Sequence, residues 1–362
     1  MFAFDIGYAI DLDRAESTAA AQTGAGAQRD FLKHTRRSPR SIEYRPAPLR
    51  VVRPGRRIAL VGHETDAAVT AAIYDFGSVS ISYSVPLSGG IDGLAALSAA
   101  IYDHAELLAD ARGHAGALLS LFGAAVNQPS LTAQAEDYVV FHFREFTPDV
   151  GGAGPDRLAL DPWRRALAAL LRAEPAALSD DEVGHAMAAV VRYGENDAAI
   201  VDWNAAVLFG PDMEDAIAVL EFANVELLEM RFLDDQLDRA LDRAHRATAE
   251  RNWPFLSRRG ASNLREIATI QVSAAILFEG VNNTLKLMGD QYLARLYQAA
   301  MTRFHLPDWD ASILRKIGSL ESIYDKLNDR QTTRRMEVLE WIIIALIAFE
   351  VWAAWVWPAI RG

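Results

Sequence analysis

The stretch from Ile313 to Ile360 constrains this chain more than any other part of its sequence. Its first part carries large side chains at alternating intervals of four and three residues, which is the heptad spacing of a coiled coil. The heptad positions are Ile313, Ile317, Leu320, Tyr324, Leu327, Gln331, Arg334, Val338 and Trp341. The spacing predicts a helix–helix seam formed by Ile317, Leu320, Tyr324, Leu327, Gln331 and Arg334.

Two partners fit this seam equally well. A second copy of the chain would make a homo-oligomer, and Gln331 and Arg334 would then favour one discrete size, because a buried polar position selects the oligomer state. In the alternative, the stripe packs internally against the second long helix of the same chain. The sequence alone leaves both arrangements open.

The heptad stretch continues into an apolar run. Residues 341–360 read WIIIALIAFEVWAAWVWPAI, twenty residues with one charge, Glu350. Twenty helical residues rise about 30 Å, the thickness of a hydrocarbon core. Trp341 lies at one end, and Trp352, Trp355 and Trp357 lie towards the other, as in an aromatic belt. The run predicts a transmembrane helix in which Glu350 meets another helix or a polar cavity, because an ionisable group costs about 2.5–3.5 kcal/mol at mid-span. We expect Glu350 to be protonated and hydrogen-bonded between helices.

The expected location follows from the charges around this span. Arg330, Arg334 and Arg335 precede it and only Arg361 follows it, which favours a cytoplasmic N-terminal side. The first residues carry acids and lack the basic and apolar regions of a signal peptide. We therefore expect a single-pass C-terminal membrane anchor with the bulk of the chain in the cytoplasm, at the inner membrane if the source is bacterial.

The net charge of −12 conceals a basic arm. Between Arg29 and Arg57 lie ten Lys and Arg residues, against only Asp30 and Glu43. Such an arm attracts RNA or an anionic lipid surface, and we assign the contact to Arg36, Arg37 and Arg40. A solvated linker stiffened by prolines is an equal alternative. The count of cysteines is 0, which excludes disulfides, thiol catalysis and Cys-ligated metal sites.

The sequence before residue 211 mixes strand and helix patterns. Ser78–Val85 alternates serine with larger side chains, which predicts a strand with one buried and one wet face. Further strands are expected at 2–12, 57–63, 137–146 and 198–209, and helices at 91–126 and 162–172. Ser179 and Glu182 form a capping box that opens another helix, which extends to about residue 192.

Three long helices are expected after this region, at about 212–252, 263–305 and 309–357, because Pro254, Gly260 and Pro307 interrupt the helical pattern. The expected fold class is α+β: an N-terminal mixed sheet-and-helix region followed by a long-helix hairpin bundle and a C-terminal transmembrane helix. The expected parts are an N-terminal strand with the basic arm, an α+β domain, a long-helix bundle or coiled coil, and the membrane helix. Their ranges are 1–56, 57–210, 211–340 and 341–360.

Several segments resemble the family of sporulation proteins described as "required for meiotic nuclear division". The segments are DWNAAVLF (202–209), NVELLEMRFLDDQLD (224–238), NTLKLMGDQYLARLY (283–297) and KLNDRQTTRRMEVLEWIIIALIAFEV (326–351). Asp5–Gly7 and Tyr74–Gly77 match more loosely. The family includes a mitochondrial inner-membrane member associated with mitochondrial translation. The resemblance implies a membrane-anchored, self-associating protein with no catalytic residues to carry over.

Groups that could perform chemistry are few. His142 and Arg144 share a face of one expected strand, and Asp202 and Asn204 share a face of another. His104 and His114 are about 15 Å apart along one expected helix, too far to share a metal. We expect no cofactor and no metal.

The sequence therefore predicts a non-enzymatic, oligomeric scaffold anchored at a membrane, which recruits RNA, ribosomes or assembly factors. One alternative is a hydrolase or nucleotide-handling enzyme, which a pocket joining His142, Arg144 and Asp202 would favour. The other is a component of a membrane transport or channel assembly, which rests on Glu350.

Overall fold

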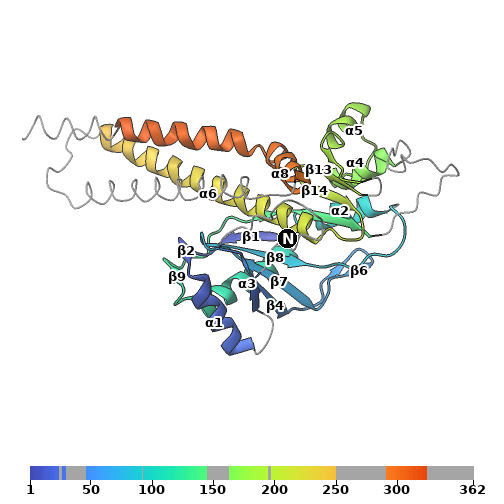
Figure 1. Ribbon diagram of the computed structural model, residues 1–362. Helices are drawn as coiled ribbons and strands as arrows, with labels where there is room; N and C mark the ends of the chain where they lie inside the picture. The colour runs from blue at the N-terminus through green and yellow to red at the C-terminus, as the bar shows by residue number, and fades with distance from the viewer. Residues whose placement is uncertain are drawn as a thin grey trace, which may run out of the picture. The chain divides into compact units, whose positions relative to one another are not determined.

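Figure 1 shows the computed structural model of the chain, which describes residues 1–23, 27–29, 46–91, 93–144, 163–194, 197–249 and 291–323. The chain divides into a first unit, Met1–Phe232 with Ser273–Asp310, and a second unit, Leu233–Val272 with Ala311–Gly362. The first unit contains both sheets and helices, so the predicted α+β class is confirmed.

The larger sheet of the first unit is six-stranded and wholly antiparallel. Its order is β10 (Glu136–Asp137), β1 (Phe2–Asp5), β8 (Ser78–Tyr83), β7 (Ala68–Ile73), β4 (Leu49–Pro54) and β3 (Ala27–Arg29). Phe2 pairs with Ile81 on one side and with Asp137 on the other, so β1 lies inside the sheet.

One face of this sheet is apolar and packs against helices α1 (Leu12–Thr23) and α3 (Ala105–Phe122), which lie together on one side in Figure 1. Phe4, Val79 and Ile81 are fully buried in this core, as is Leu118 of α3. Alternate residues of each strand meet here, which is why the apolar side chains recur with a period of two.

The opposite face carries the small residues Ala3, Ala72, Ser78 and Ser80, and the first part of α6 (Glu214–Ala249) covers it. The predicted wet face is therefore wrong at Ser78 and Ser80, which are 0% exposed, whereas Ser84, beyond the end of β8, is exposed. Alternation revealed that the strand has two different faces but not that a helix would bury the polar one. The serines leave room for the helix because their side chains are short.

The second sheet has the order β11 (Val139–Phe143), β14 (Ala205–Phe209), β13 (Ala198–Val201) and β12 (Val190–Val191). Strands β11 and β14 are parallel, and the other pairs are antiparallel. The single strand expected at 198–209 is thus a hairpin, in which the Asp202 N–H donates to the Ala205 carbonyl at 2.9 Å. Asp202 and Asn204 lie at the turn, where Asp and Asn are favoured.

The remaining elements are short. The expected helix at 91–126 is broken into α2 (Leu94–Ile101) and α3, with Asp103 at a φ of 55° between them. Helix α4 spans Arg164–Arg172 and α5 spans Asp180–Ala186, and Ser179 caps α5 by accepting from the Glu182 N–H at 3.2 Å, as its sequence predicts. The other elements are the two-residue pairs β2 (Ala9–Ile10) with β9 (Val126–Asn127) and β5 (Ala59–Leu60) with β6 (His63–Glu64).

The long helices are described in part. Helix α6 confirms the helix expected at 212–252, and its residues after Phe232 belong to the second unit. Helix α8 (Gln291–Arg303) lies in the range expected for the second helix. Residues 306–323 form the start of the third, and Figure 1 shows them alongside α6.

The structure corrects the predicted membrane helix and membrane location. In the ranges that the structure describes, no helix is both long and apolar enough to cross a bilayer. Helix α6 is long but carries charges throughout, such as Asp234, Asp235 and Arg239, and the 13 residues of α8 span only about 20 Å. The predicted anchor residues Trp341, Glu350, Trp352, Trp355 and Trp357 lie outside the described residues.

The residues that follow β1 are in close backbone contact with the turn before β8. Gly77 has a φ of 106°, and a Cβ on it would lie 1.8 Å from the Gly7 carbonyl oxygen. The Gly77 carbonyl accepts from the Ile6 N–H at 2.9 Å. The loosely matching segments Asp5–Gly7 and Tyr74–Gly77 therefore lie in direct backbone contact, and glycine is required there by both conformation and space.

We expect Gly77→Ala to lower the free energy of unfolding by at least about 2 kcal/mol, because a left-handed conformation and a backbone clash are combined. Urea denaturation gives the loss in the free energy of unfolding for Gly77→Ala and for Gly89→Ala, and the difference between the two losses reports the clash. Gly89 is the matched control, with a φ of 114° and nothing within 4 Å of an added Cβ. Equal losses in the two variants would contradict the close approach to Gly7.

Candidate functional site

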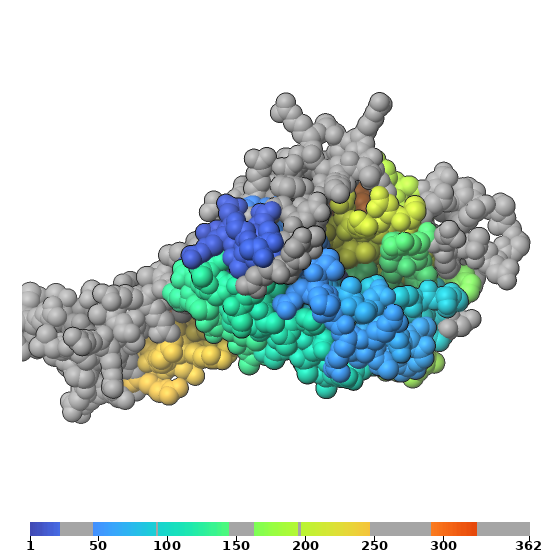
Figure 2. All heavy atoms as spheres, turned by 90° about the horizontal axis from the view of Figure 1, so that it is seen from below, coloured from blue at the N-terminus to red at the C-terminus, as the bar shows by residue number. Residues whose placement is uncertain are grey.

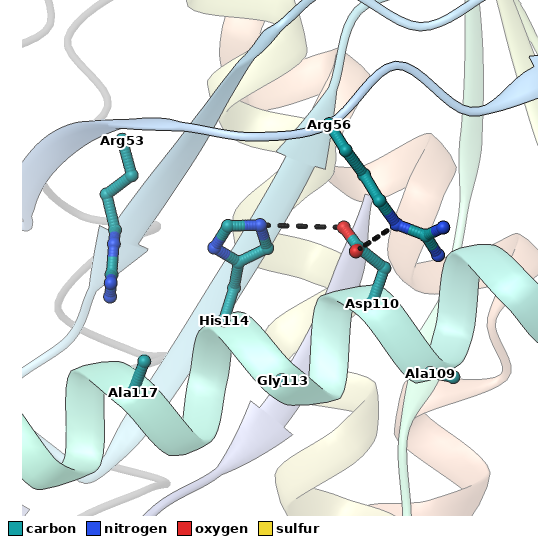
Figure 3. Close-up of a pocket in the computed structure, with 7 residues that line it drawn as sticks. All are labelled: Arg53, Arg56, Ala109, Asp110, Gly113, His114 and Ala117. Atoms are coloured by element: carbon teal, nitrogen blue, oxygen red, sulfur yellow. Dashed lines mark hydrogen bonds and ion pairs between the residues drawn. The ribbon is translucent and has the colours of Figure 1, made fainter.

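A pocket of about 450 Å³ lies between α3 and the chain at the end of β4 (Figure 3). Its lining residues are Arg53, Arg56, Ala109, Asp110, Gly113, His114 and Ala117. Ala109, Gly113 and Ala117 are four residues apart, so they form one stripe on α3. The space exists because this stripe has almost no side chains. On the face of the molecule shown in Figure 2, α3 and the segment from β4 to β6 lie next to each other.

Asp110 is the centre of the polar groups in this pocket. Its carboxylate accepts from Arg56 Nε at 2.8 Å and from the Tyr83 hydroxyl at 2.7 Å. Partial burial raises the pKa of Asp110, but the hydrogen bonds from Arg56 and Tyr83 and the nearby charges outweigh burial and lower it. Asp110 is therefore an ionised, structurally engaged group.

His114 lies one turn further along α3, with Nε2 3.5 Å from Asp110 Oδ2. A carboxylate can only accept, so Nε2 carries the hydrogen when the ring is neutral. Burial lowers the pKa of His114; Asp110 raises it, and Arg53 lowers it further. The net lowering keeps the ring mostly neutral at pH 7, with its Nδ1 lone pair free to accept.

Arg53 approaches the pocket from β4. Its Nη1 atom is buried and has no hydrogen-bond partner within the described part of the chain. Arg56, by contrast, also forms an ion pair with Glu106 at 2.8 Å. The pocket therefore combines one engaged arginine, one arginine with an unused donor, and a neutral histidine. None of the seven lining residues is a serine, threonine, cysteine or lysine that could act as a nucleophile.

The catalytic cluster considered from the sequence does not form. His142 Nε2 donates to the Gly210 carbonyl at 2.7 Å, beyond the end of β14. Asp202 lies before the start of the same strand, so the two residues are separated by the length of β14. Arg144 is exposed, and Asn204 is buried at the turn.

Asp202 has a structural environment instead. Its side chain is 0% exposed and pairs with Arg172 of α4 at 3.0 Å and with Arg303 of α8. Its carbonyl accepts from the Tyr138 hydroxyl at 2.9 Å. A buried carboxylate held by two guanidinium groups fixes neighbouring elements, because removing one partner leaves an uncompensated charge.

A row of carboxyl groups on α6 faces the serine side of the larger sheet. Glu221 accepts from Arg50 at 2.7 Å and from Ser82 at 2.9 Å. Glu229 accepts from Ser78 and lies close to Asp5 of β1. These contacts join α6 to β1, β4 and β8 through polar groups.

Asp5 and Glu229 form a pair of buried carboxyl groups. Burial raises the pKa of Asp5 to about 8, and the charge of Glu229 raises it too. Burial likewise raises the pKa of Glu229 to about 7, although the bond from Ser78 lowers it. The pair therefore retains at least one proton near neutral pH.

A second buried acid lies on another side of α6. Glu226 accepts from the Tyr297 hydroxyl of α8. Burial raises the pKa of Glu226 to about 8; the hydrogen bond from Tyr297 lowers this pKa, and the charge of Asp310 raises it. The three groups link α6, α8 and the residues that follow α8. The sequence pattern gave no sign of these buried acids, because a glutamate on a long helix is normally solvated.

In the second unit, the helix at 311–323 packs against the later part of α6. Lys316 pairs with Asp234 at 2.8 Å and with Asp238 at 2.6 Å. Ile313 and Leu320 are 0% and 1% exposed, while Ile317 is half-buried and Leu314 is 59% exposed. Leu320 of the predicted seam is thus buried within one chain, on a helix that ion pairs join to the later part of α6.

The other predicted contacts lie outside the described residues. These are Tyr324, Leu327, Gln331 and Arg334 of the seam and Arg36, Arg37 and Arg40 of the basic arm. Their intermolecular roles stay predictions.

In the described ranges, no group of three or more His, Cys, Asp or Glu residues could hold a metal. His104 caps α3 by accepting from the Leu107 N–H at 3.2 Å.

The sequence reasoning missed the pocket. The spacing of Asp110 and His114 indicates that they share a helix face, and the three small residues beside them mark a bare stripe. What the sequence does not give is the approach of Arg53 and Arg56, which come from a strand and the residues just after it.

A family model described as "Uncharacterized protein MJ0711, N-terminal domain" matches residues 1–216, so this chain belongs to that family. The chain is 23% identical over 218 residues to the "Uncharacterized protein MJ0711" of Methanocaldococcus jannaschii. The match covers 60% of this chain and 65% of the archaeal one. No solved structure matches. The matched residues include β1, the pocket and both sheets, and they end just inside α6.

The carboxyl pair predicts a pH dependence of stability. In the unfolded chain Asp5 and Glu229 lose their protons near pH 4, but in the folded protein they retain them until about pH 7–8. The unfolded state then binds fewer protons, so this contribution to the free energy of unfolding is intact below pH 4 and falls as the pH rises to 8.

We expect Glu229→Gln to flatten this fall, so that the variant gains about 1–2 kcal/mol relative to the wild type between pH 5 and pH 8. Urea denaturation at each pH measures the difference. Glu64→Gln is the control, because Glu64 is 58% exposed and its ion pair with Arg57 is long, at 3.6 Å. A parallel pH profile for Glu229→Gln and wild type would show that the pair is ionised.

Proposed function

We propose that this protein is a non-enzymatic scaffold that self-associates through its second unit. The observation that carries the proposal is the apolar edge left by the helix at 311–323. Ile313 and Leu320 are used inside the chain, while Leu314 is exposed and Ile317 is only half-buried. Residues three apart are neighbours on a helix surface, so the two side chains form one strip. Its occupant is a second copy of the chain, because Ile317 of this strip is the first residue of the predicted heptad seam.

The polar residues support a structural role over catalysis. His142 and Asp202 lie at opposite ends of β14, and Asp202 forms ion pairs with Arg172 and Arg303. The hydrolase alternative required these groups to meet in one pocket. The channel alternative rested on Glu350 and on the membrane helix, and it is withdrawn with them.

The resemblance to the meiotic nuclear division family agrees with a self-associating protein. We extend the proposal to an RNA or ribosome contact made by the basic arm, in which Arg36, Arg37 and Arg40 bind phosphate groups. The assembly would then present several basic arms, whose linked binding raises the overall affinity.

Size-exclusion chromatography of the full chain with light-scattering detection tests self-association. We expect one discrete species larger than the 39.8 kDa chain. Leu314→Asp and Ile317→Asp should each weaken assembly at least tenfold with an unchanged circular dichroism spectrum, since a charge cannot be buried unpaired. Leu87→Asp is the control, because Leu87 is 41% exposed and lies in the first unit. A wild-type monomer at all concentrations would overturn the proposal.

RNA binding across a salt series tests the basic arm. Reversing the charge of Arg36, Arg37 and Arg40 together should weaken binding and reduce the slope of log affinity against log salt by about 2–3, one counterion for each lost phosphate contact. The control reverses three arginines of α6, Arg239, Arg243 and Arg246, of which Arg246 is 77% exposed. The same loss in both triple variants would mean that only net charge matters.

A further inference from the structure

We propose that the pocket between α3 and β4 binds a small molecule through an oxyanion, a phosphate or carboxylate group, held between Arg53 and His114. This site is separate from the scaffold function proposed above. The charges, the unused hydrogen-bonding capacity and the free space of the pocket all favour an anion beside Arg53.

The charges of the pocket leave Arg53 without a counter-ion. Arg56 and Asp110 neutralise one another at 2.8 Å, and Glu106 takes a second nitrogen of Arg56. The oxygens of Asp110 are already used by Arg56 and the Tyr83 hydroxyl. No ion pair joins Arg53 to a described residue. Among the residues that line the pocket, the charge of Arg53 is therefore in excess and favours an anion, because Glu106, which would balance it, is not part of the lining.

Arg53 also has unused hydrogen-bonding capacity. Its Nη1 atom is buried and unpartnered in the described ranges, and a buried donor without an acceptor costs about 1–3 kcal/mol. A guanidinium group presents its donors as a planar fork that matches two oxygens of a carboxylate or phosphate. A bound oxyanion would supply the acceptor that this guanidinium group lacks.

His114 supplies the opposing contact. Figure 3 shows its ring between Arg53 and Asp110, with Nε2 directed at Asp110. The charged groups that face the ring are Arg53, from β4, and Asp110, from its own helix, with Arg56 and Tyr83 behind Asp110. An anion on Arg53 removes the repulsion that opposes protonation of the ring. Protonated His114 then donates from Nδ1, so binding takes up a proton and is tighter at lower pH.

The small-residue stripe accommodates the rest of the ligand. A Cβ added to Gly113 meets nothing within 4 Å, so the space above this residue is free. A volume of about 450 Å³ is within the range of small-molecule sites. The walls formed by Ala109 and Ala117 are apolar, which suits a non-polar part of a ligand rather than further charge.

Isothermal titration calorimetry of the full chain at pH 6 tests the site, with inorganic phosphate and acetate as separate probes in chloride buffer. We expect saturable binding of at least one probe and at least tenfold weaker binding at pH 8. Arg53→Gln should weaken it at least tenfold, whereas Arg57→Gln, at an exposed position outside the pocket, should not. Phosphate-only binding assigns the site to phosphate compounds, and acetate-only binding to carboxylates.

A second pair of variants keeps the test independent of Arg53. Gly113→Leu should fill the pocket and abolish binding without loss of thermal stability, because leucine favours a helix over glycine. Gly184→Leu in α5, another glycine with nothing within 4 Å, should bind as the wild type does. Absence of saturable binding of both probes by the wild type, or unchanged affinity in Gly113→Leu, would overturn the proposal. Either outcome leaves the self-association experiment untouched.

Discussion

The packing of α6 on the serine face of the six-stranded sheet is the contact on which the first unit depends. A helix normally covers a sheet with apolar side chains, but here Glu221 and Glu229 bond to Ser82 and Ser78 across the interface. Buried polar groups cost stability unless their partners are in place. The contact therefore fixes the position of the helix closely, since a shift by one turn would leave both carboxyl groups without their partners.

The same principle organises the second sheet. Asp202 joins α4 and α8 to the turn between β13 and β14, through Arg172 and Arg303. Tyr138, just before β11, bonds to the same residue. Such residues resemble a catalytic constellation in a sequence, because both kinds of site need charged groups on a sheet. Here the full burial of Asp202 and its ion pairs with two arginines indicate a structural role.

The sequence predicts local features of this chain well. The long helix α6 and the cap at Ser179 follow from periodicity and from short-range hydrogen bonding, which few residues determine. The burial of Ser78 and Ser80 could not be predicted, because it depends on α6, far away in the chain. The hairpin at 198–209 was missed because neither Gly nor Pro marks its turn. The pocket escaped prediction because absent side chains on α3 define it as much as present ones do.

The place of β1 within its sheet also affects how the protein folds. Phe2 pairs with Ile81 and with Asp137, so the strand has no partner from its own neighbourhood in sequence. Each pairing closes a long loop, and chains dominated by such distant contacts fold slowly. Until β8 and β10 arrive, both edges of an apolar strand are unpaired, and such edges are open to other chains. The sheet that makes the native fold secure therefore makes its assembly the stage most exposed to aggregation.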